Sequence, residues 1–208
     1  MKIAGIILAG GLSRRMGGQD KSLIELGGKS LISHCIDRLQ PQVSTLAINA
    51  NGDPLRFDTL SLPVIADVIE GHAGPLAGVH AGMQWAAKQN DITHILTAAA
   101  DTPFFPTTLA NALASSISQN DENAIAMAKS NDRLHPVFAL WPIAIFNALD
   151  DFLINQKTRK VLAFTDQFML IEVSFDKSGD ETQLDPFFNI NTAEDLETAR
   201  TVLQKVQP

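Results

Sequence analysis

An apolar run that ends in a glycine-rich loop is the feature that most constrains the fold of this chain. The run covers Ile3 to Leu8 and predicts a buried β-strand. The loop that follows interleaves glycines with cations, namely Gly10, Gly11, Arg14, Arg15, Gly17, Gly18 and Lys21. Glycines let backbone N–H groups approach a ligand closely, and the cations neutralise phosphate charge. In an α/β chain, such a strand and loop predict a nucleotide site.

The spacing within this loop differs from two familiar phosphate-binding patterns. Five residues separate Gly11 from Gly17, and Lys21 comes three positions after Gly18, so the Walker A motif is absent. The dinucleotide fingerprint Gly-x-Gly-x-x-Gly is absent as well, which disfavours a redox dehydrogenase. The plainer alternative is a solvated glycine-rich turn with charges placed by chance.

Strand-like and helix-like segments alternate along the chain, which predicts an α/β fold with a mostly parallel central sheet flanked by helices. The expected strands are 2–8, 44–49, 63–66, 93–99, 124–128, 136–140 and 168–173. Apolar stripes predict helices at 31–39, from Gly74, after Pro106, after Pro142, and from Thr192, where Asp195 completes an acidic capping box. Because the 208 residues contain no linker or repeat, we expect a single domain spanning 1–208.

Polar residues follow three of the expected strands, at the point where each strand ends. Asn49, Asp67 and Asp101 occupy these positions. Since the carboxyl ends of parallel strands meet at one edge of a sheet, we expect these side chains beside the glycine-rich loop. Any one of them alone is also compatible with an ordinary turn. Asp101 opens the run Asp-Thr-Pro-Phe104, and a strand-end carboxylate is a good Mg²⁺ ligand because Mg²⁺ prefers hard oxygen ligands.

Composition and charge exclude several classes of partner. The net charge of −7 argues against nucleic acid or an anionic membrane. No apolar run approaches the ~18 residues of a membrane span, and the apolar N-terminus runs into two arginines rather than a cleavage site. Cys35 is the only cysteine and lies on the apolar face of an expected helix, which predicts a buried thiol in a reducing compartment. We therefore expect a cytoplasmic protein.

The segment from Leu8 to Lys21 has the pattern Leu-Ala-Gly-Gly-x-Ser-x-Arg-Met-Gly-x-x-Asp-Lys. It resembles the signature of the molybdenum cofactor guanylyltransferases, which are nucleotidyltransferases with a Rossmann-like fold. Four further segments resemble this family in the same order along the chain: 74–78, 101–104, 133–136 and 189–192. The chain departs from the family pattern at Ala193, where Pro is usual, and in the bland run Ala98-Ala-Ala100 before Asp101.

The resemblance implies a reaction and a set of site residues. The reaction is GMP transfer from GTP to Mo-molybdopterin, which releases pyrophosphate and forms the guanine dinucleotide cofactor. The implied catalytic residues are Lys21, Asp101 and Arg15, with Asp101 holding Mg²⁺. The implied GTP-binding residues are Leu8, Ala9, Gly10, Gly11, Lys21, Asn49, Asp67 and Asp101, with guanine and ribose not yet divided between Asn49 and Asp67. The C-terminal half would bind the pterin through Arg159, Asn189 and Asn191.

Alternatives from two classes stay open on the sequence. The same chemistry with another nucleotide or acceptor would make the chain a molybdopterin cytidylyltransferase or a sugar-phosphate nucleotidyltransferase. A different class would be a non-catalytic GTP-binding protein that chaperones the cofactor. The pair Gly10-Gly11 resembles the guanylyl branch. The resemblance leaves open a GTP-binding accessory protein and molybdoenzyme maturation proteins as further partners.

Overall fold

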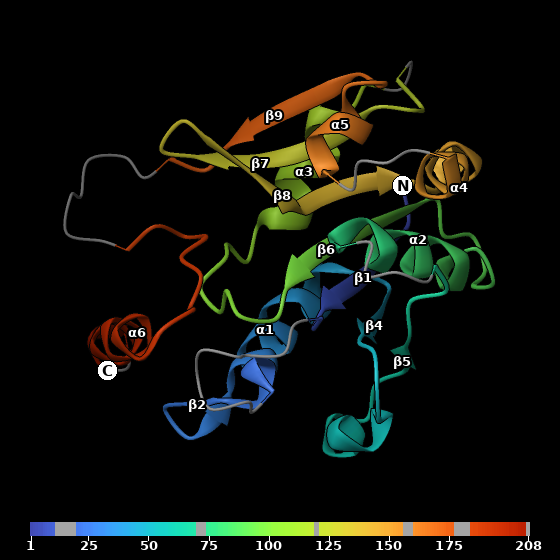
Figure 1. Cartoon of the computed structure of the whole chain (residues 1–208). Helices are drawn as coiled ribbons and strands as arrows, with labels where there is room; N and C mark the ends of the chain where they lie inside the picture. Colours follow the sequence, from blue (N-terminus) through green and yellow to red (C-terminus); the bar gives the residue numbers. More distant parts are fainter. Residues whose placement is uncertain (11–19, 70–73, 119–120, 156–159, 177–183, 207–208) are drawn as a thin grey trace.

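Seven strands form the central sheet of the molecule, in the order β5-β4-β1-β6-β8-β7-β9 (Figure 1). The computed structural model describes residues 1–10, 20–69, 74–118, 121–155, 160–176 and 184–206. The strands of the sheet are β1 (Ile3–Leu8), β4 (Thr45–Asn49), β5 (Val64–Ile65), β6 (His94–Ala99), β7 (Ile125–Ser130), β8 (Arg133–Pro142) and β9 (Leu170–Ser174). A separate two-stranded hairpin consists of β2 (Glu25–Leu26) and β3 (Lys29–Ser30).

All neighbouring strands of the sheet run parallel except at β8, which is antiparallel to both β6 and β7. This arrangement confirms the predicted α/β class with a mostly parallel sheet. β8 is longer than the expected strand 136–140, because its pairing with β7 extends it back to Arg133. The two strands are joined at Asn131 and Asp132, whose φ angles of 47° and 58° are the positive values that a tight hairpin turn needs.

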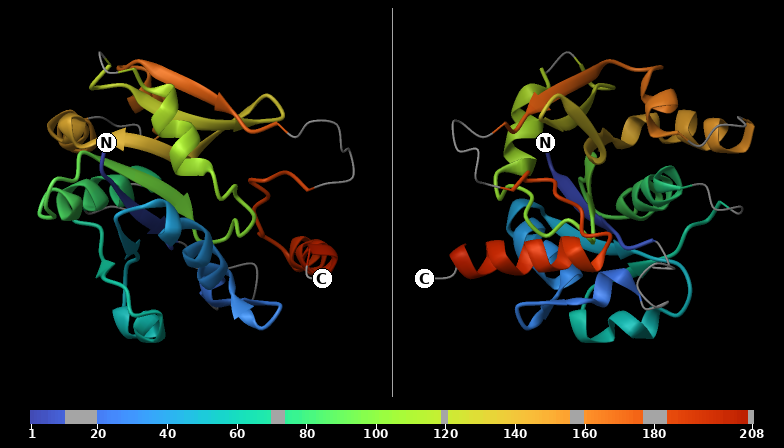
Figure 2. Two further views of the ribbon diagram at one scale, coloured as in Figure 1. Left: turned by 180° about the vertical axis from the view of Figure 1, so that it is seen from behind. Right: turned by 60° about the vertical axis from the view of Figure 1, so that its left-hand side comes forward.

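Helices cover both faces of the sheet, as predicted (Figure 2). They are α1 (Leu31–Leu39), α2 (Pro75–Ala86), α3 (Leu109–Ser116), α4 (Phe146–Asn155), α5 (Val161–Thr165) and α6 (Ala193–Val206). α1 and α3 pack on one face, and α2, α4 and α5 pack on the other. The helices on each face bury an apolar core against the sheet. Because β1 and β6 face a core on both sides, their sequences are almost continuously apolar.

Local sequence signals account for several helix boundaries. The Ser30 side chain caps α1 by accepting a hydrogen bond from the Ser33 N–H, and the apolar stripe of this helix is buried as predicted. Pro142 ends β8 and caps a 3₁₀ turn (Ile143–Ile145), so α4 begins three residues later than the proline alone predicts. The short helix α5 and the hairpin β2–β3 were not predicted, because neither is long enough to show a periodic apolar pattern.

α6 lies beside β2, apart from the central sheet (Figure 1). Its residues Leu196 and Ala199 join Leu26, Leu31 and Ile190 in a small third core. This core fixes the segment before α6 against the hairpin and the start of α1, so a C-terminal segment reaches the N-terminal part of the fold. None of the helices in the described ranges combines the length and the apolar character needed to cross a membrane.

Candidate functional site

The carboxyl ends of β1, β4, β5 and β6 meet at one edge of the sheet, where open parallel sheets bind their ligands. The ends are in register, because Leu8 pairs with both Asn49 and Ala99, and Asn49 pairs with Ile65. The backbone continues this register for one residue beyond β1, since the Ala9 N–H donates to the Asn49 carbonyl over 2.8 Å. The strand-end residues predicted from the sequence therefore do share one edge.

The Lys21 ammonium group is the centre of a cluster of side-chain oxygens. Its Nζ atom lies 2.5 Å from Asp101 Oδ2, 2.6 Å from Asn191 Oδ1 and 3.1 Å from Asn189 Oδ1. The side chains of Lys21 and Asp101 are 14% and 23% exposed, so this ion pair is partly shielded from water. Four residues separated by up to 170 positions in the chain thus converge on one point.

Separate local structures present the members of this cluster. Lys21 opens a 3₁₀ turn (Lys21–Leu23) that Asp20 caps by accepting hydrogen bonds from the Ser22 N–H and hydroxyl. Asp101 lies just beyond β6, and its carbonyl accepts a 2.9 Å hydrogen bond from the Ile190 N–H. The Ile190 side chain is fully buried, so the asparagines on either side of it, in an extended segment, both reach Lys21.

The N-terminus of α6 fixes the position of Asn191. The Asp195 carboxylate accepts hydrogen bonds from the backbone N–H groups of Asn191 and Thr192, each over 2.8 Å. The Thr192 hydroxyl in turn accepts a hydrogen bond from the Asp195 N–H, which completes the predicted capping box. The hydrogen bond from the Asn191 N–H, and then those from Thr192, hold the pKa of Asp195 below its ordinary value.

Asn49 and Asp67 also lie together, a second grouping that their strand-end positions predicted. Asn49 Nδ2 donates to Asp67 Oδ1 over 2.9 Å and to the Ile65 carbonyl over 3.2 Å. Asn51 holds the other carboxylate oxygen, since its Nδ2 donates to Asp67 Oδ2 over 2.8 Å. The Asn51 Oδ1 accepts a hydrogen bond from the Asp67 N–H over 2.9 Å. Asp67 is therefore held in place by two asparagines.

Two glycines let α2 approach the sheet directly beneath this grouping. A Cβ atom on Gly78 would overlap Asn49 Oδ1 and come within 2.7 Å of Leu8 Cδ2. A Cβ atom on Gly82, one turn further along, would come within 2.8 Å of Ile6 Cγ1. The predicted close approach is confirmed, and at Gly78 it also determines where the Asn49 side chain can lie.

Gly10 is exposed at the end of β1, and a Cβ atom added to it would meet no atom of the described residues within 4 Å. The described part of the chain therefore leaves the Gly10 backbone open to a ligand. Leu8 is half-buried and Ala9 is buried at the same strand end. The predicted site residues Gly11, Arg15 and Arg159 lie outside the described residues.

Two polar residues of this edge, Asn51 and Arg56, were not predicted from the sequence. Asn51 follows Asn49 by two positions, so its place just beyond a strand end could have indicated it. Arg56 had no such signal, because it lies in a 3₁₀ segment (Pro54–Leu60) and reaches Asp20 only through the tertiary fold.

His135 is at the same edge of the sheet, near the start of β8. Its Nε2 atom lies 2.7 Å from the Ser130 hydroxyl, which donates to the Asp185 carboxylate, and its ring stacks on Phe187. Burial lowers the pKa of His135 in spite of the nearby Asp185, which favours the neutral form of the ring. Phe187 and Asp185 belong to the segment that carries Asn189, so this contact ties that segment to the hairpin β7–β8.

Cys35 is buried on α1 as predicted, and its thiol donates to the carbonyls of Ala99 and Ala100. Burial, and then the negative charge of Asp101, raise its pKa far above the usual range of a thiol. A thiol that stays protonated is a poor nucleophile, so Cys35 has a structural role beneath the site.

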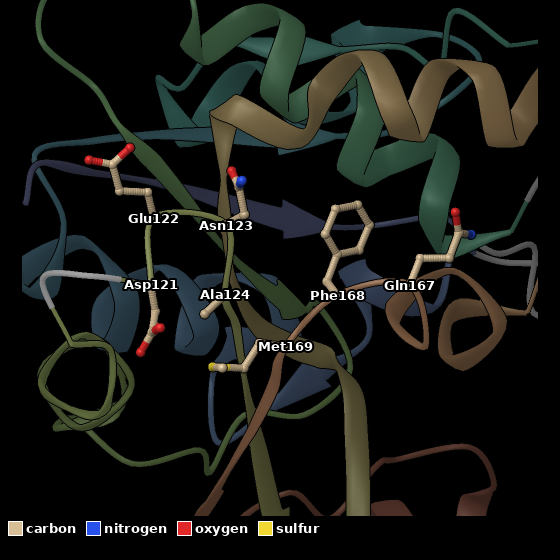
Figure 3. A pocket seen from close by; sticks show the side chains of 7 residues that line it. All are labelled: Asp121, Glu122, Asn123, Ala124, Gln167, Phe168 and Met169. Atoms are coloured by element: carbon tan, nitrogen blue, oxygen red, sulfur yellow. The ribbon is translucent and has the colours of Figure 1, made fainter.

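A pocket lies at the opposite edge of the sheet from the cluster around Lys21 (Figure 3). Its residues precede β7 and β9, whereas the cluster around Lys21 lies beyond the carboxyl ends of the strands. They are Asp121, Glu122, Asn123, Ala124, Gln167, Phe168 and Met169. Within the described ranges, no group of three or more His, Cys, Asp or Glu side chains is arranged to hold a metal ion.

A lysine that pairs with a strand-end carboxylate, on the sheet edge where the glycine after β1 is exposed, suits the transfer of a nucleotidyl group between phosphates. The fold agrees, and the protein is a nucleotidyltransferase. A family model described as "MobA-like NTP transferase domain" matches residues 5–168. A molybdenum cofactor guanylyltransferase from Mesorhizobium japonicum is 47% identical over 204 residues, which cover 98% of this chain and 97% of that protein. The chain belongs to the molybdenum cofactor guanylyltransferase family.

Solved structures agree with this assignment. Molybdopterin-guanine dinucleotide biosynthesis protein A from Archaeoglobus fulgidus has a TM-score of 0.74 at 25% identity, covering 99% of this chain and 100% of that chain. Rv0371c from Mycobacterium tuberculosis, solved in complex with manganese, has a TM-score of 0.65 at 16% identity, covering 99% and 100% of the two chains. The second likeness concerns the fold alone.

Proposed function

We propose that this chain transfers GMP from GTP to the terminal phosphate of Mo-molybdopterin, forming molybdopterin guanine dinucleotide and pyrophosphate. The convergence of Asp101, Asn189 and Asn191 on Lys21 is the observation that carries the proposal. It joins a cation from the glycine-rich loop to a strand-end carboxylate and to the segment that resembles the pterin side of the family. A donor and an acceptor phosphate could thus meet at one point.

In this proposal, GTP lies along the strand ends. Its phosphates approach the backbone at Gly10, where the exposed position and the lack of a side chain leave room for them. The proposal assigns a second phosphate contact to the next residue in the sequence, Gly11. Its nucleoside lies toward Asn49, whose amide can donate and accept hydrogen bonds, and toward Asp67, whose carboxylate accepts hydrogen bonds from guanine and ribose. Leu8 and Ala9 supply the strand end against which the nucleotide packs.

The reaction needs no covalent intermediate on the protein. An oxygen of the terminal pterin phosphate attacks the α-phosphorus of GTP, and the bond from that phosphorus to the bridging oxygen of the β-phosphate breaks. The attacking phosphate is already largely ionised near neutral pH, since its second pKa is about 6. Lys21 and Arg15 would stabilise the charge that develops on the α-phosphate and on the leaving pyrophosphate.

The residues around Lys21 fit a bound Mg²⁺. Asp101, Asn189 and Asn191 each direct an oxygen at one cation, the Lys21 ammonium group, and hard oxygen ligands are those that Mg²⁺ prefers. Asp101 would hold the ion, with the amide oxygens within reach. When bound, Mg²⁺ would neutralise phosphate charge and align the triphosphate.

We assign acceptor binding to Arg159, Asn189 and Asn191 in the C-terminal half of the single domain 1–208. Because both asparagines contact Lys21, they would bring the acceptor phosphate directly to the phosphate end of GTP. We expect the reaction to take place in the cytoplasm. A GTP-binding accessory protein and molybdoenzyme maturation proteins would be the macromolecular partners, rather than nucleic acid or a membrane.

The test is pyrophosphate release and dinucleotide formation by the purified chain supplied with Mg²⁺, Mo-molybdopterin and GTP, CTP or ATP in turn. The proposal expects turnover with GTP, and Asp37→Ala, at the exposed ion pair with Lys29, serves as a surface control. A preference for CTP would make the chain a cytidylyltransferase. GTP binding without pyrophosphate release would instead support the non-catalytic chaperone.

A further inference from the structure

Arg56 makes three hydrogen bonds that point in three different directions. Its Nε donates to Asp20 Oδ2 over 2.7 Å, its Nη1 to the Asp53 carbonyl over 2.7 Å, and its Nη2 to the Asn51 carbonyl over 2.8 Å. The guanidinium group also lies 4.5 Å from the centroid of the buried Phe57 ring. Arg56 uses three different nitrogens of its planar guanidinium group for these three acceptors, whereas a lysine would have to donate from a single nitrogen.

Asp20 connects Arg56 to the turn that carries Lys21. Asp20 Oδ2 accepts the bond from Arg56, while Asp20 Oδ1 caps the turn that opens with Lys21. The side chains of Arg56 and Asp20 are only 25% and 17% exposed, so water screens this ion pair weakly. Without the arginine, the Asp20 carboxylate would lose its charged partner in a place that is largely shielded from solvent.

Asn51 connects Arg56 to the proposed nucleoside site. The Asn51 carbonyl accepts from Arg56, and the Asn51 side chain holds Asp67 through two hydrogen bonds. Gly52, with φ of +85°, forms the backbone that makes room for the guanidinium group, since a Cβ atom there would lie 3.3 Å from Arg56 Nη1. Backbone shape and side-chain contacts therefore both support the same position of the arginine.

We infer that Arg56 is a positioning residue that sets the distance between the two ends of the bound nucleotide. It links the cation at the phosphate end, Lys21, to the carboxylate at the nucleoside end, Asp67, through Asp20 and Asn51. This inference rests on the proposed function, because it assigns those two ends to GTP. Arg56 touches neither reacting group in this scheme. It acts by fixing the distance between Lys21 and Asp67.

If Arg56 fixes the spacing between the two ends of the site, its loss should affect GTP and fragments of GTP differently. GTP must contact both ends at once, so its affinity depends on the spacing between them. Guanosine contacts only the nucleoside end, and inorganic tripolyphosphate contacts only the phosphate end. A variant that lets the two ends move relative to each other should therefore weaken GTP binding while leaving both fragments almost unaffected.

The experiment measures the affinity of GTP, guanosine and tripolyphosphate, with Mg²⁺ present, for the wild type, Arg56→Ala and Arg56→Lys. Arg200→Ala is the matched control, because Arg200 forms an exposed ion pair with Glu197 on the surface of α6. We expect both Arg56 variants to bind GTP about 10- to 100-fold more weakly, the range for a lost charge-assisted contact, and to bind the fragments within about twofold of wild type. Arg56→Lys keeps the charge and serves if Arg56→Ala fails to fold.

A double-mutant cycle with Asp20→Asn tests whether Arg56 acts through Asp20. The double variant should be little worse than Arg56→Ala alone, since Arg56→Ala already removes the contact with Asp20 that Asp20→Asn weakens. Full additivity would overturn the inference, as would unchanged GTP binding in Arg56→Ala. If Arg56→Ala lost as much affinity for tripolyphosphate as for GTP, Arg56 would contact phosphate directly, and this result would also overturn the inference. If the wild type itself binds no GTP, the proposed function fails instead.

Discussion

Replacing Gly78 with alanine would test how α2 controls the nucleoside end of the site. The added methyl group would overlap Asn49 Oδ1 and would lie within 2.7 Å of Leu8 Cδ2. Asn49 is only 5% exposed, and the backbone of β4 that carries it is paired on both sides, so the side chain has to rotate rather than retreat. Rotation would break its 2.9 Å hydrogen bond to Asp67.

Two opposing effects set the change in stability. Gly→Ala in a helix interior gains about 0.5–1 kcal/mol in the free energy of folding, while overpacking a core costs about 1–3 kcal/mol. The net loss is therefore about 0–2.5 kcal/mol. The effect on binding is separate. Because Asn51 still holds Asp67, we expect the loss of the Asn49 contact to cost about 1.4 kcal/mol, or roughly tenfold in GTP affinity.

Gly82→Ala is the control for this prediction. Its Cβ atom would meet Ile6 Cγ1 at 2.8 Å and Ile95 Cδ1 at 3.2 Å, so it crowds the same helix–sheet contact without touching Asn49. Urea unfolding and GTP titration of both variants separate the two effects. We expect similar losses of stability but a binding loss in Gly78→Ala alone. Equal GTP affinities in the two variants would refute the reasoning.

Four further predictions concern single residues. Asp101→Ala should remain folded and lose at least about 10²–10³ in the rate of pyrophosphate release, and normal turnover would exclude it as the essential Mg²⁺ ligand. Lys21→Ala should lower the single-turnover rate more than the GTP affinity, because charge develops on phosphate oxygens in the transition state, whereas equal losses would contradict this role. Gly10→Ala should leave stability unchanged, since its Cβ has open space, and should narrow the preference for GTP over CTP in kcat/KM, which a competition assay measures. Asp195 has a pKa below its ordinary 3.8, so its stabilising effect is complete above that value and is lost as the pH falls through the lower folded pKa. The free energy of unfolding of Asp195→Ala should thus fall about 0.5–2 kcal/mol below that of wild type at neutral pH, and a gap that does not narrow as the pH falls below 3.8 would argue against this cap.

Local signals in the sequence predicted much of the framework. The apolar stripe at 31–39 gave the bounds of α1, and the Thr192–Asp195 pair gave the capping box of α6. These features depend on residues three or four positions apart, so the spacing along the chain is sufficient to define them. The direction of β8 could not be predicted in this way, because it depends on pairing with β7 and β6 rather than on its own composition.

The sequence by itself determined the strand and glycine-rich loop, and it placed Asn49, Asp67 and Asp101 at strand ends, because each of these is a local relation between neighbouring residues. Only the tertiary structure decided that Asn189 and Asn191 meet Lys21, across 168 and 170 positions. It also decided that Arg56 reaches Asp20, 36 positions away. Neither contact leaves a periodic pattern in the chain, since both join short 3₁₀ turns to segments that are distant in the sequence. Ile190 shows the reason, because burying it in the third core is what carries the two asparagines to the lysine.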